Sequence, residues 1–351
     1  MRKRTVRLGE TLTEIRFLSR REAGQIIPEV PLAVFDENTA GLFDTYPGDR
    51  GIVLPPGEIA KNWVSVESIL SRALDRGLGR DGTIAGIGGG VVCDLTGFAA
   101  SVYMRGTGLE LFPTTLLAMT DASVGGKTGI DFGGYKNILG SFYPARRVYI
   151  AVELLETLPE REYRSGLAEV IKHALLGNRE LFELLENRRD DILAGRDASL
   201  LEEMVYQSVG VKIGFVEEDF RETGRRAFLN FGHTFGHALE SCYGFRGDIS
   251  HGEAVAWGMI TALEAGRAAG ITDGEYAEAA AGLIAGYGFH LRPGYDPEEL
   301  MAARGRDKKM KSGRVRFVLQ RDFGETLTSE LEEPLLREVL VRMKRRPPRE
   351  R

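Results

Sequence analysis

The order of hydrophobic and polar positions divides the chain into a first part of alternating strands and helices and a second part that is mainly helical. Residues 5–18 alternate like two strands around a glycine turn, and residues 30–37 and 51–58 are short apolar runs that end in polar residues. Residues 64–76 place apolar side chains on one helical face, and residues 83–90 form another buried strand that runs into glycines. Strand, helix and strand in units of about 30 residues predict an open α/β sheet with helices on both faces and ligands at the carboxyl ends of its strands.

The pattern changes near residue 158, beyond which helical periodicity dominates and a single strand-like piece appears at residues 314–320. A chain of 351 residues also exceeds the size at which one hydrophobic core usually suffices. We therefore expect an α/β domain over residues 1–158 and a mainly α-helical domain over residues 159–351.

Composition and charge narrow the class of protein. The chain is 43% hydrophobic and 28% charged, as in soluble globular proteins, and its net charge of -5 argues against a general nucleic-acid binder. Cys93 and Cys242 are far apart and have no CxxC partner, so neither a disulfide framework nor a thiolate metal site is indicated. No signal peptide and no run of 18 apolar residues is present, so we expect a cytoplasmic protein with no membrane partner.

Two glycine-rich stretches are suited to phosphate groups. Residues 86–94, GIGGGVVCD, place three glycines after a strand, where backbone amides can approach a pyrophosphate at the start of a helix. This is not a GxGxxG motif, and a plain turn is the alternative. Within residues 112–137, Lys127 and Lys136 each follow a glycine pair, an arrangement that can bind phosphate. A solvated, hairpin-like loop is the alternative for that stretch.

An acidic residue in an apolar setting is the next candidate. Glu169 lies among apolar residues in GLAEVIKH, where an unpaired carboxylate would be costly to bury. The carboxylate needs a cation, and either Lys172 or a metal ion can supply it. A surface ion pair between Glu169 and Lys172 is the structural alternative.

Three of the five histidines in the chain occur close together, at His233, His237 and His251. If the first two lie in a helix, their spacing of four places them on one face, where they can serve a metal, a phosphate or a proton transfer. Arg226 and Asn230 precede them at a similar spacing, so one helical face is expected to carry all four donors toward an anion. Packing of satisfied imidazoles between helices is the alternative.

The chain resembles the 3-dehydroquinate synthase family of sugar phosphate cyclases, and the likeness runs from about Leu54 to Phe323. Seven stretches carry it, and their common order is far more specific than any one of them: GGGVVCDLTGFAASVYMRG, PTTLLAMTDASVGGKTGID, YKNILGSFYP, LPEREYRSGLAEVIK, RRAFLNFGHTFGHALE, HGEAVAWG and DKKMKSGRVRFVL. The resemblance implies an N-terminal Rossmann-like nucleotide-binding α/β domain followed by a mostly α-helical metal- and substrate-binding domain.

The resemblance also implies an activity, that of a carbon–oxygen lyase in the shikimate pathway, which leads to chorismate and the aromatic amino acids. Its substrate is 3-deoxy-D-arabino-heptulosonate 7-phosphate, and its products are 3-dehydroquinate and phosphate. NAD+ acts catalytically: an alcohol is oxidised, phosphate is eliminated, the ketone is reduced again, and ring opening precedes an intramolecular aldol closure. One divalent metal, Zn2+ or Co2+, and a cytoplasmic homodimer complete the expectation.

Site residues follow from the same resemblance. The metal ligands would be Glu169, His233 and His251. The substrate would be bound by Lys127, Asn230, His237, Asp121, Lys172, Lys212, Arg226, Lys309 (or its neighbour Lys308), and Arg105 from the neighbouring subunit. NAD would be bound by Glu58, Lys61, Gly89, Gly90, Asp94, Thr114, Thr115, Lys127, Lys136 and the turn from Leu154 to Thr157.

Three other functions compete with this interpretation. A different sugar phosphate cyclase, of the 2-deoxy-scyllo-inosose or valiolone synthase type, would act on another sugar phosphate. Such relatives tend to alter the GGKTG loop and the carboxylate-binding residues, which are intact here. A metal-dependent polyol dehydrogenase would give no reason for so many phosphate-directed lysines, and a non-catalytic NAD-binding module would not need both a metal set and a phosphate set.

Overall fold

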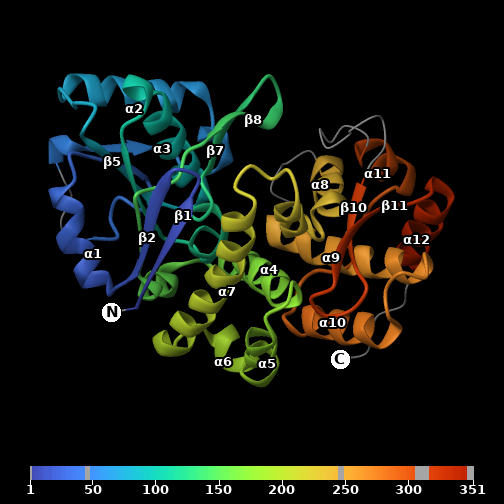
Figure 1. The fold of residues 1–351 in the computed structure, drawn as a ribbon. Helices are drawn as coiled ribbons and strands as arrows, with labels where there is room; N and C mark the ends of the chain where they lie inside the picture. Colours follow the sequence, from blue (N-terminus) through green and yellow to red (C-terminus); the bar gives the residue numbers. More distant parts are fainter. Residues whose placement is uncertain (1, 44–47, 244–248, 305–315, 346–351) are drawn as a thin grey trace. The chain divides into compact units, whose positions relative to one another are not determined.

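The chain forms two compact units, each assembled from two separate stretches of sequence. The computed structural model describes residues 2–43, 48–243, 249–304 and 316–345 (Figure 1). The first unit contains Met1–Tyr163 and Gly195–Glu222, and the second contains Arg164–Ala194 and Thr223–Arg351. The chain thus first leaves the α/β unit close to the expected boundary, but it returns for residues that the sequence pattern had assigned to the helical domain.

A seven-stranded sheet is the centre of the first unit. Its strand order is β1-β2-β9-β6-β5-β3-β4, with β1 antiparallel to β2 and every other neighbouring pair parallel. The predicted open α/β sheet is confirmed. The strands are β1 Lys3–Leu8, β2 Thr11–Phe17, β3 Leu32–Asp36, β4 Gly51–Leu54, β5 Thr83–Gly88, β6 Gly108–Pro113 and β9 Arg147–Ile150.

Helices cover both faces of this sheet, because alternate residues of its buried strands point to opposite sides. On β5, Ala85 and Ile87 join the apolar cluster beneath α1 (Arg20–Ile26). Gly86 faces the other side, where a Cβ would come within 2.8 Å of the Thr96 hydroxyl on α3 (Gly90–Val102). The predicted helix over residues 64–76 is α2 (Trp63–Asp75), which packs beside α3.

The stretch from residue 112 to residue 142 contains a helical turn and a hairpin of two strands. One turn of π-helix, η5 (Ala118–Ala122), precedes an antiparallel hairpin of β7 (Lys127–Phe132) and β8 (Tyr135–Phe142). The hairpin turns at Gly133 and Gly134, both with positive φ, and β7 packs against α3. The hairpin projects at its tip beyond α3 (Figure 1).

Helix α7 (Ala198–Glu218) is the segment that returns to the first unit. It packs on β1, on η5 and on the short helix η6 (Val152–Thr157). The guanidinium groups of Arg2 and Arg4 lie 4.8 and 3.9 Å from the centre of the Tyr206 ring on α7. Such partners lie far away in sequence, so helical periodicity alone could not assign α7 to a unit.

Helices make up most of the second unit. One small sheet pairs β10 (Arg316–Gln320), which was expected, with β11 (Thr326–Glu330), which was not. None of the helices in the described part of the chain has the length and apolar character needed to cross a membrane. The helices are α4 Glu160–Leu175, which begins in the first unit, α5 Arg179–Asn187, α6 Arg189–Ala194, α8 His233–Cys242, α9 His251–Ala268, α10 Gly274–Gly286, α11 Pro297–Arg304 and α12 Glu333–Arg345.

Glycines let the backbones of α4, α8 and α9 approach one another closely. A Cβ on Gly258 of α9 would lie 2.0 Å from the carbonyl oxygen of Gly232, and one on Gly236 of α8 would lie 2.9 Å from the carbonyl oxygen of Ala254. At the start of α9, a Cβ on Gly252 would lie 2.3 Å from Ser165 on α4. Side chains at the N-termini of α8 and α9 are therefore held next to α4.

Substitution of Gly258 by alanine tests this close packing. Gly258→Ala should lower the free energy of unfolding by about 1–3 kcal/mol, because the new methyl group meets rigid backbone. Gly282→Ala is the matched control, since Gly282 is exposed inside α10 with nothing within 4 Å of its Cβ position. That control should gain about 0.5–1 kcal/mol from helix propensity. Equal urea-unfolding curves for the two variants would contradict the packing argument.

Candidate active site

Three side chains of the second unit bring potential metal ligands together: Glu169 from α4, His233 from the start of α8 and His251 from the start of α9. The Glu169 Oε1 atom lies 3.6 Å from His233 Nε2 and 3.5 Å from His251 Nε2. This buried oxygen makes no hydrogen bond to the described residues. Ligand atoms around a tetrahedral zinc ion are separated by about 3.4 Å, given bonds of about 2.0–2.1 Å. The set therefore fits a zinc-type ion.

The other oxygen of Glu169 is bonded by Lys172, one helical turn later. Both side chains are buried, so a surface pair, the alternative left open by the sequence, is wrong. Burial by itself would raise the pKa of Glu169, but Lys172 and His251 outweigh it and hold that pKa well below its ordinary value. The carboxylate is therefore ionised and has one oxygen directed at the two imidazoles.

The two imidazoles direct the same ring nitrogen, Nε2, at Glu169. In His233 the Nδ1 atom lies 3.4 Å from the Phe231 carbonyl oxygen, and in His251 it lies 3.4 Å from Glu240 Oε1. In both rings Nε2 is left to face Glu169. Burial opposes protonation of His251, but the Glu169 and Glu240 carboxylates raise its pKa to about 10. A metal ion that binds this ring must therefore displace a proton.

His237 occupies the next turn of α8, as its spacing from His233 predicted, and the two ring centres are 5.2 Å apart. It does not belong to the set around Glu169, but its nitrogen lies within 4.8 Å of ligand atoms of Glu240 and His251. The structure therefore presents two overlapping groups of ligand atoms that share His251.

The expected single helical face for Arg226, Asn230 and the two histidines is wrong. Arg226 and Asn230 lie in a separate short helix, η7 (Arg225–Asn230), and the chain breaks at Gly232 before α8 begins. Gly232 has a φ of 82° and lies against the backbone of α9, so no other residue fits there without strain. Arg226 is buried, and the Asn230 side chain donates a hydrogen bond to the Ala227 carbonyl oxygen at 3.1 Å.

In the first unit, most of the residues expected at NAD follow the carboxyl ends of parallel strands. Gly89 immediately precedes α3, and a Cβ there would lie 3.1 Å from the Thr115 methyl group. The Thr114 amide donates to the Gly88 carbonyl oxygen at 3.0 Å, which joins the ends of β5 and β6. The residues placed in this way are Glu58 after β4, Gly89 and Gly90 after β5, Thr114 and Thr115 after β6, and Leu154 and Thr157 after β9.

Lys61, also expected at NAD, is a buried lysine at the centre of a polar cluster. Its ammonium lies 2.5 Å from Asp94 and donates to Asn137 Oδ1 at 2.6 Å. Burial opposes the charge, but the Asp94 and Glu58 carboxylates raise the pKa of Lys61, so it remains an ammonium. Lys136 lies 3.2 Å from Glu58. Asn137 was not anticipated; its positive φ of 51° is uncommon but well tolerated by asparagine.

Two further lysines of the first unit have acidic partners. Lys212, buried on α7, donates to both the carboxylate and the backbone carbonyl of Asp121 in η5. Lys127, the first residue of β7, is bonded to Glu222, which follows α7. Glu222 was missed, because an acid in a polar segment of sequence does not disclose a partner 95 residues away.

Two other residues expected at the substrate are Arg105 and Lys309. Arg105 ends the short helix η4 (Tyr103–Arg105), is exposed and has a positive φ of 64°. Lys309, like Lys308, lies outside the described residues.

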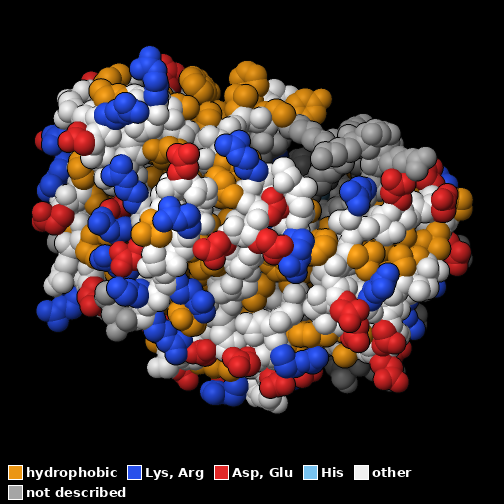
Figure 2. Space-filling view, viewed as in Figure 1, with side chains coloured by type: hydrophobic (Ala, Val, Ile, Leu, Met, Phe, Trp, Pro, Cys, Tyr) orange, Lys and Arg blue, Asp and Glu red, His pale blue; other side chains and the backbone are white. Residues whose placement is uncertain are grey.

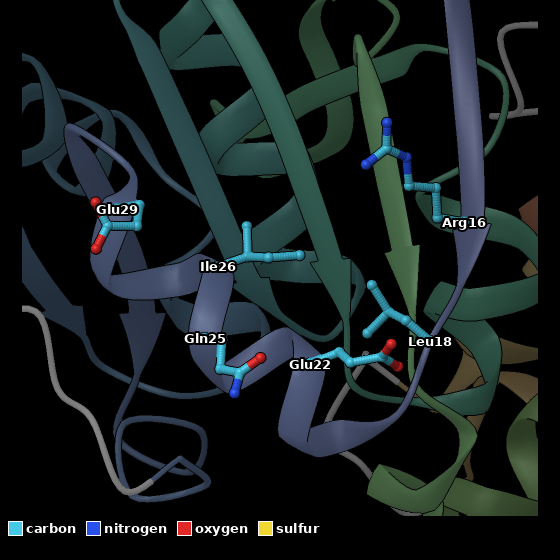
Figure 3. Close-up of a pocket in the computed structure, with 6 residues that line it drawn as sticks. All are labelled: Arg16, Leu18, Glu22, Gln25, Ile26 and Glu29. Carbon is cyan, nitrogen blue, oxygen red and sulfur yellow. The ribbon is translucent and has the colours of Figure 1, made fainter. Parts of the chain in front are cut away.

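A separate pocket of the first unit contains none of the expected residues. It lies between β2 and α1 and is lined by Arg16, Leu18, Glu22, Gln25, Ile26 and Glu29 (Figure 3). The side chains around it are apolar, charged with both signs or, in Gln25, a neutral amide, and they offer no converging ligand set, so the pocket does not compete with the site above.

Comparison with protein families covers most of the chain. Residues 51–165 match a model described as 3-dehydroquinate synthase N-terminal, and residues 166–310 match one described as 3-dehydroquinate synthase C-terminal. A 3-dehydroquinate synthase from Nostoc punctiforme is 42% identical over 294 residues, which is 83% of this chain and 81% of that protein. One from Dictyoglomus thermophilum is 42% identical over 299 residues, 83% of this chain and 84% of that protein.

Solved structures show the same fold. A 2-epi-5-epi-valiolone synthase from Streptomyces hygroscopicus subsp. jinggangensis, with NAD+ and Zn2+ bound, is 25% identical with a TM-score of 0.86, covering 97% of this chain and 99% of that one. A 2-deoxy-scyllo-inosose synthase is 22% identical with a TM-score of 0.85, at the same coverage.

The geometry predicts which residues hold the metal. Glu169→Ala should weaken zinc binding by more than about 100-fold, since loss of even an outer partner costs 10–100-fold. Glu169→Gln keeps an oxygen near Lys172 and is the second variant to measure if Glu169→Ala does not fold. His237→Ala should retain one zinc per chain. Elemental analysis after dialysis measures the zinc content of each variant. A His237→Ala protein without zinc would show that His233 and His237, the i, i+4 pair on α8, form the metal site instead.

Proposed function

The chain belongs to the 3-dehydroquinate synthase family, and from this premise we propose that it converts 3-deoxy-D-arabino-heptulosonate 7-phosphate into 3-dehydroquinate and phosphate. The observation that carries the proposal is the buried Glu169 oxygen that faces two imidazoles, in a chain 42% identical to such synthases along most of its length. The reaction is redox-neutral overall, because the hydride removed in the first step is returned after phosphate has left.

The residues described above fit both cofactors. When bound, NAD+ supplies a reversible hydride acceptor, and the divalent ion supplies a Lewis acid for substrate oxygens. Glu169, His233 and His251 hold the ion. Lys172 keeps Glu169 ionised and fixes its orientation by bonding Oε2, so that Oε1 faces the two imidazoles and would be the oxygen offered to the ion.

In the second unit, Asn230, His237 and Arg226 are assigned to substrate oxygens. His237 lies beside the proposed metal ligands without belonging to the set around Glu169, and we assign its imidazole to the phosphate group. Arg226 and Asn230 lie together in η7, where a guanidinium and an amide offer several donors to carboxylate or phosphate. We also assign a phosphate contact to Lys309, on the family likeness alone.

In the first unit, the strand ends bind NAD. Gly89 and Gly90 give the pyrophosphate free access to the N-terminus of α3, where amides and the helix dipole favour an anion. Lys127 and Lys212 supply positive charge for the substrate. Their ion pairs with Glu222 and Asp121 hold each ammonium in position. The other assigned NAD residues, given above, follow β4, β6 and β9 or lie in α3 and in the hairpin.

We further propose a homodimer in which Arg105 serves the neighbouring active site. Exposed apolar side chains of the first unit include Val102 and Met104, which are close to Arg105 in the sequence, and Phe132, Tyr135 and Phe142 of the hairpin. The Tyr143 hydroxyl, next to this group, donates to the Thr107 carbonyl oxygen at 2.5 Å, which ties the two parts together. Figure 2 shows hydrophobic side chains exposed over the hairpin. Exposed apolar side chains such as these favour burial against another chain.

Mixed dimers test this arrangement. Arg105→Ala and Lys127→Ala chains, each nearly inactive alone, should regain about half of the activity per dimer when purified as heterodimers with two tags. One of the two sites then has a wild-type Lys127 and receives a wild-type Arg105. If Arg105 acted within its own subunit, both sites would be defective and the heterodimer would stay inactive.

The activity itself is tested by measuring phosphate and NADH together. With the heptulosonate 7-phosphate, Zn2+ and a trace of NAD+, phosphate should be released over many turnovers without accumulation of NADH. His237→Ala, which keeps its metal, should lose phosphate release by at least about 100-fold, as expected for a lost general acid–base or phosphate contact.

Three results would overturn the assignment in different ways. Stoichiometric NADH would indicate a polyol dehydrogenase. Phosphate release from glucose 6-phosphate but not from the heptulosonate would indicate an inosose synthase. If neither phosphate nor NADH forms with any of these sugars, the result would indicate a non-catalytic NAD-binding module.

A further inference from the structure

The proposed metal set leaves a second carboxylate beside it unexplained. Glu240 lies on α8 seven residues after His233 and three after His237, so all three share one face of the helix. Its Oε1 atom is 3.4 Å from His251 Nδ1, the ring nitrogen that points away from Glu169. The imidazole of His251 therefore lies between two carboxylates, with one ring nitrogen directed at each.

Helix energetics do not account for an acid at this position. Glu240 lies in the last turn of α8, where the helix dipole disfavours negative charge. Its side chain is only 12% exposed, so solvent does not compensate for the charge. The first residue of α9, His251, brings an N–H donor to it. The close glycine packing of α8 on α9 makes this approach possible.

His233 provides an internal comparison. Its Nδ1 atom faces the Phe231 carbonyl oxygen at 3.4 Å, the same distance and the same ring nitrogen as in His251. An acceptor at Nδ1 places the proton there and leaves the lone pair of Nε2 for a metal ion. Both imidazoles thus have Nδ1 facing an acceptor, which is a backbone carbonyl for His233 and a carboxylate for His251.

We infer that Glu240 is a positioning residue of the metal centre: it accepts the Nδ1 proton of His251 and fixes the ring so that Nε2 faces the ion. This inference rests on the proposed metal site. The alternative is that Glu240 is itself a ligand of a second ion, together with His237 and His251, because those three ligand atoms also lie within 4.8 Å of one another. One imidazole nitrogen cannot both carry a proton toward Glu240 and bind a second ion, so the two roles are exclusive.

Metal affinity distinguishes the roles without any measurement of catalysis. Zinc binding is measured by competition with a chromogenic chelator for the full chain and for Glu240→Ala and Glu240→Gln. Glu240→Ala should bind zinc about 10–100-fold more weakly. Glu240→Gln should lose less, because its amide oxygen still accepts the Nδ1 proton although the charge is gone. Cobalt-loaded Glu240→Gln should also show a shifted visible absorption spectrum, since the basicity of the His251 ligand changes.

Two controls make the result specific. Glu275→Ala removes an exposed carboxylate from α10 in the same unit and should bind zinc as the wild type does. Glu169→Ala, measured in parallel, reports on the metal site itself. If both Glu169→Ala and Glu240→Ala keep their zinc, the proposed metal site is wrong. If Glu169→Ala loses zinc and Glu240→Ala keeps it, only the role of Glu240 is wrong.

Further outcomes decide the inference directly. Zinc affinity of Glu240→Ala within twofold of the wild type would overturn it. A wild-type stoichiometry of two ions, reduced to one in Glu240→Ala with the tighter site unchanged, would make Glu240 a ligand and also overturn it. If Glu240→Ala does not fold, Glu240→Gln decides: weaker zinc binding supports the inference, and unchanged affinity together with an unchanged cobalt spectrum contradicts it.

Discussion

The second unit depends on one electrostatic constraint, the burial of the Glu169 carboxylate among apolar side chains of α4. A buried anion must be compensated at both oxygens, or burial would raise its pKa until it became neutral. Lys172 compensates one oxygen, and the other is directed at the Nε2 atoms of His233 and His251. The same geometry that keeps the carboxylate ionised therefore suits it to the metal-ligand role that we propose for it.

This convergence requires backbones to approach closely, and glycines provide the space. Gly232, Gly236 and Gly258 bring α8 onto α9, and Gly252 brings the start of α9 onto α4. Each histidine that faces Glu169 is the first residue of its helix, so it lies where these close contacts fix the backbone. Packing, electrostatics and ligand geometry thus depend on the same few contacts.

Much of this could be predicted from the sequence where the signal is local. The strands and helices of the first unit follow from alternation and helical spacing. The proposed metal ligands, Glu169, His233 and His251, come from the family motifs, and the fold brings these three side chains together. What could not be predicted depends on partners distant in sequence. The apolar face of α7 does not indicate which unit the helix covers. Lys212 was therefore expected in the helical domain, whereas α7 belongs to the first unit.

The missed features have a similar origin. The periodicity from Arg226 to His237 is continuous, yet Gly232 breaks the helix because α9 leaves no room for a side chain there. Glu222 and Glu240 look like ordinary polar positions until the fold brings Lys127 and His251 to them. Acids of this kind are recognisable only once the three-dimensional neighbours are known.

The central claim is that Glu169, His233 and His251 together hold one metal ion. X-ray absorption at the zinc edge of the loaded wild-type protein measures that ligand set most directly. The account predicts two imidazole nitrogens at about 2.0–2.1 Å, with the remaining ligands oxygen at about 2.0–2.2 Å and no sulfur. Three imidazoles, or any sulfur ligand, would contradict it.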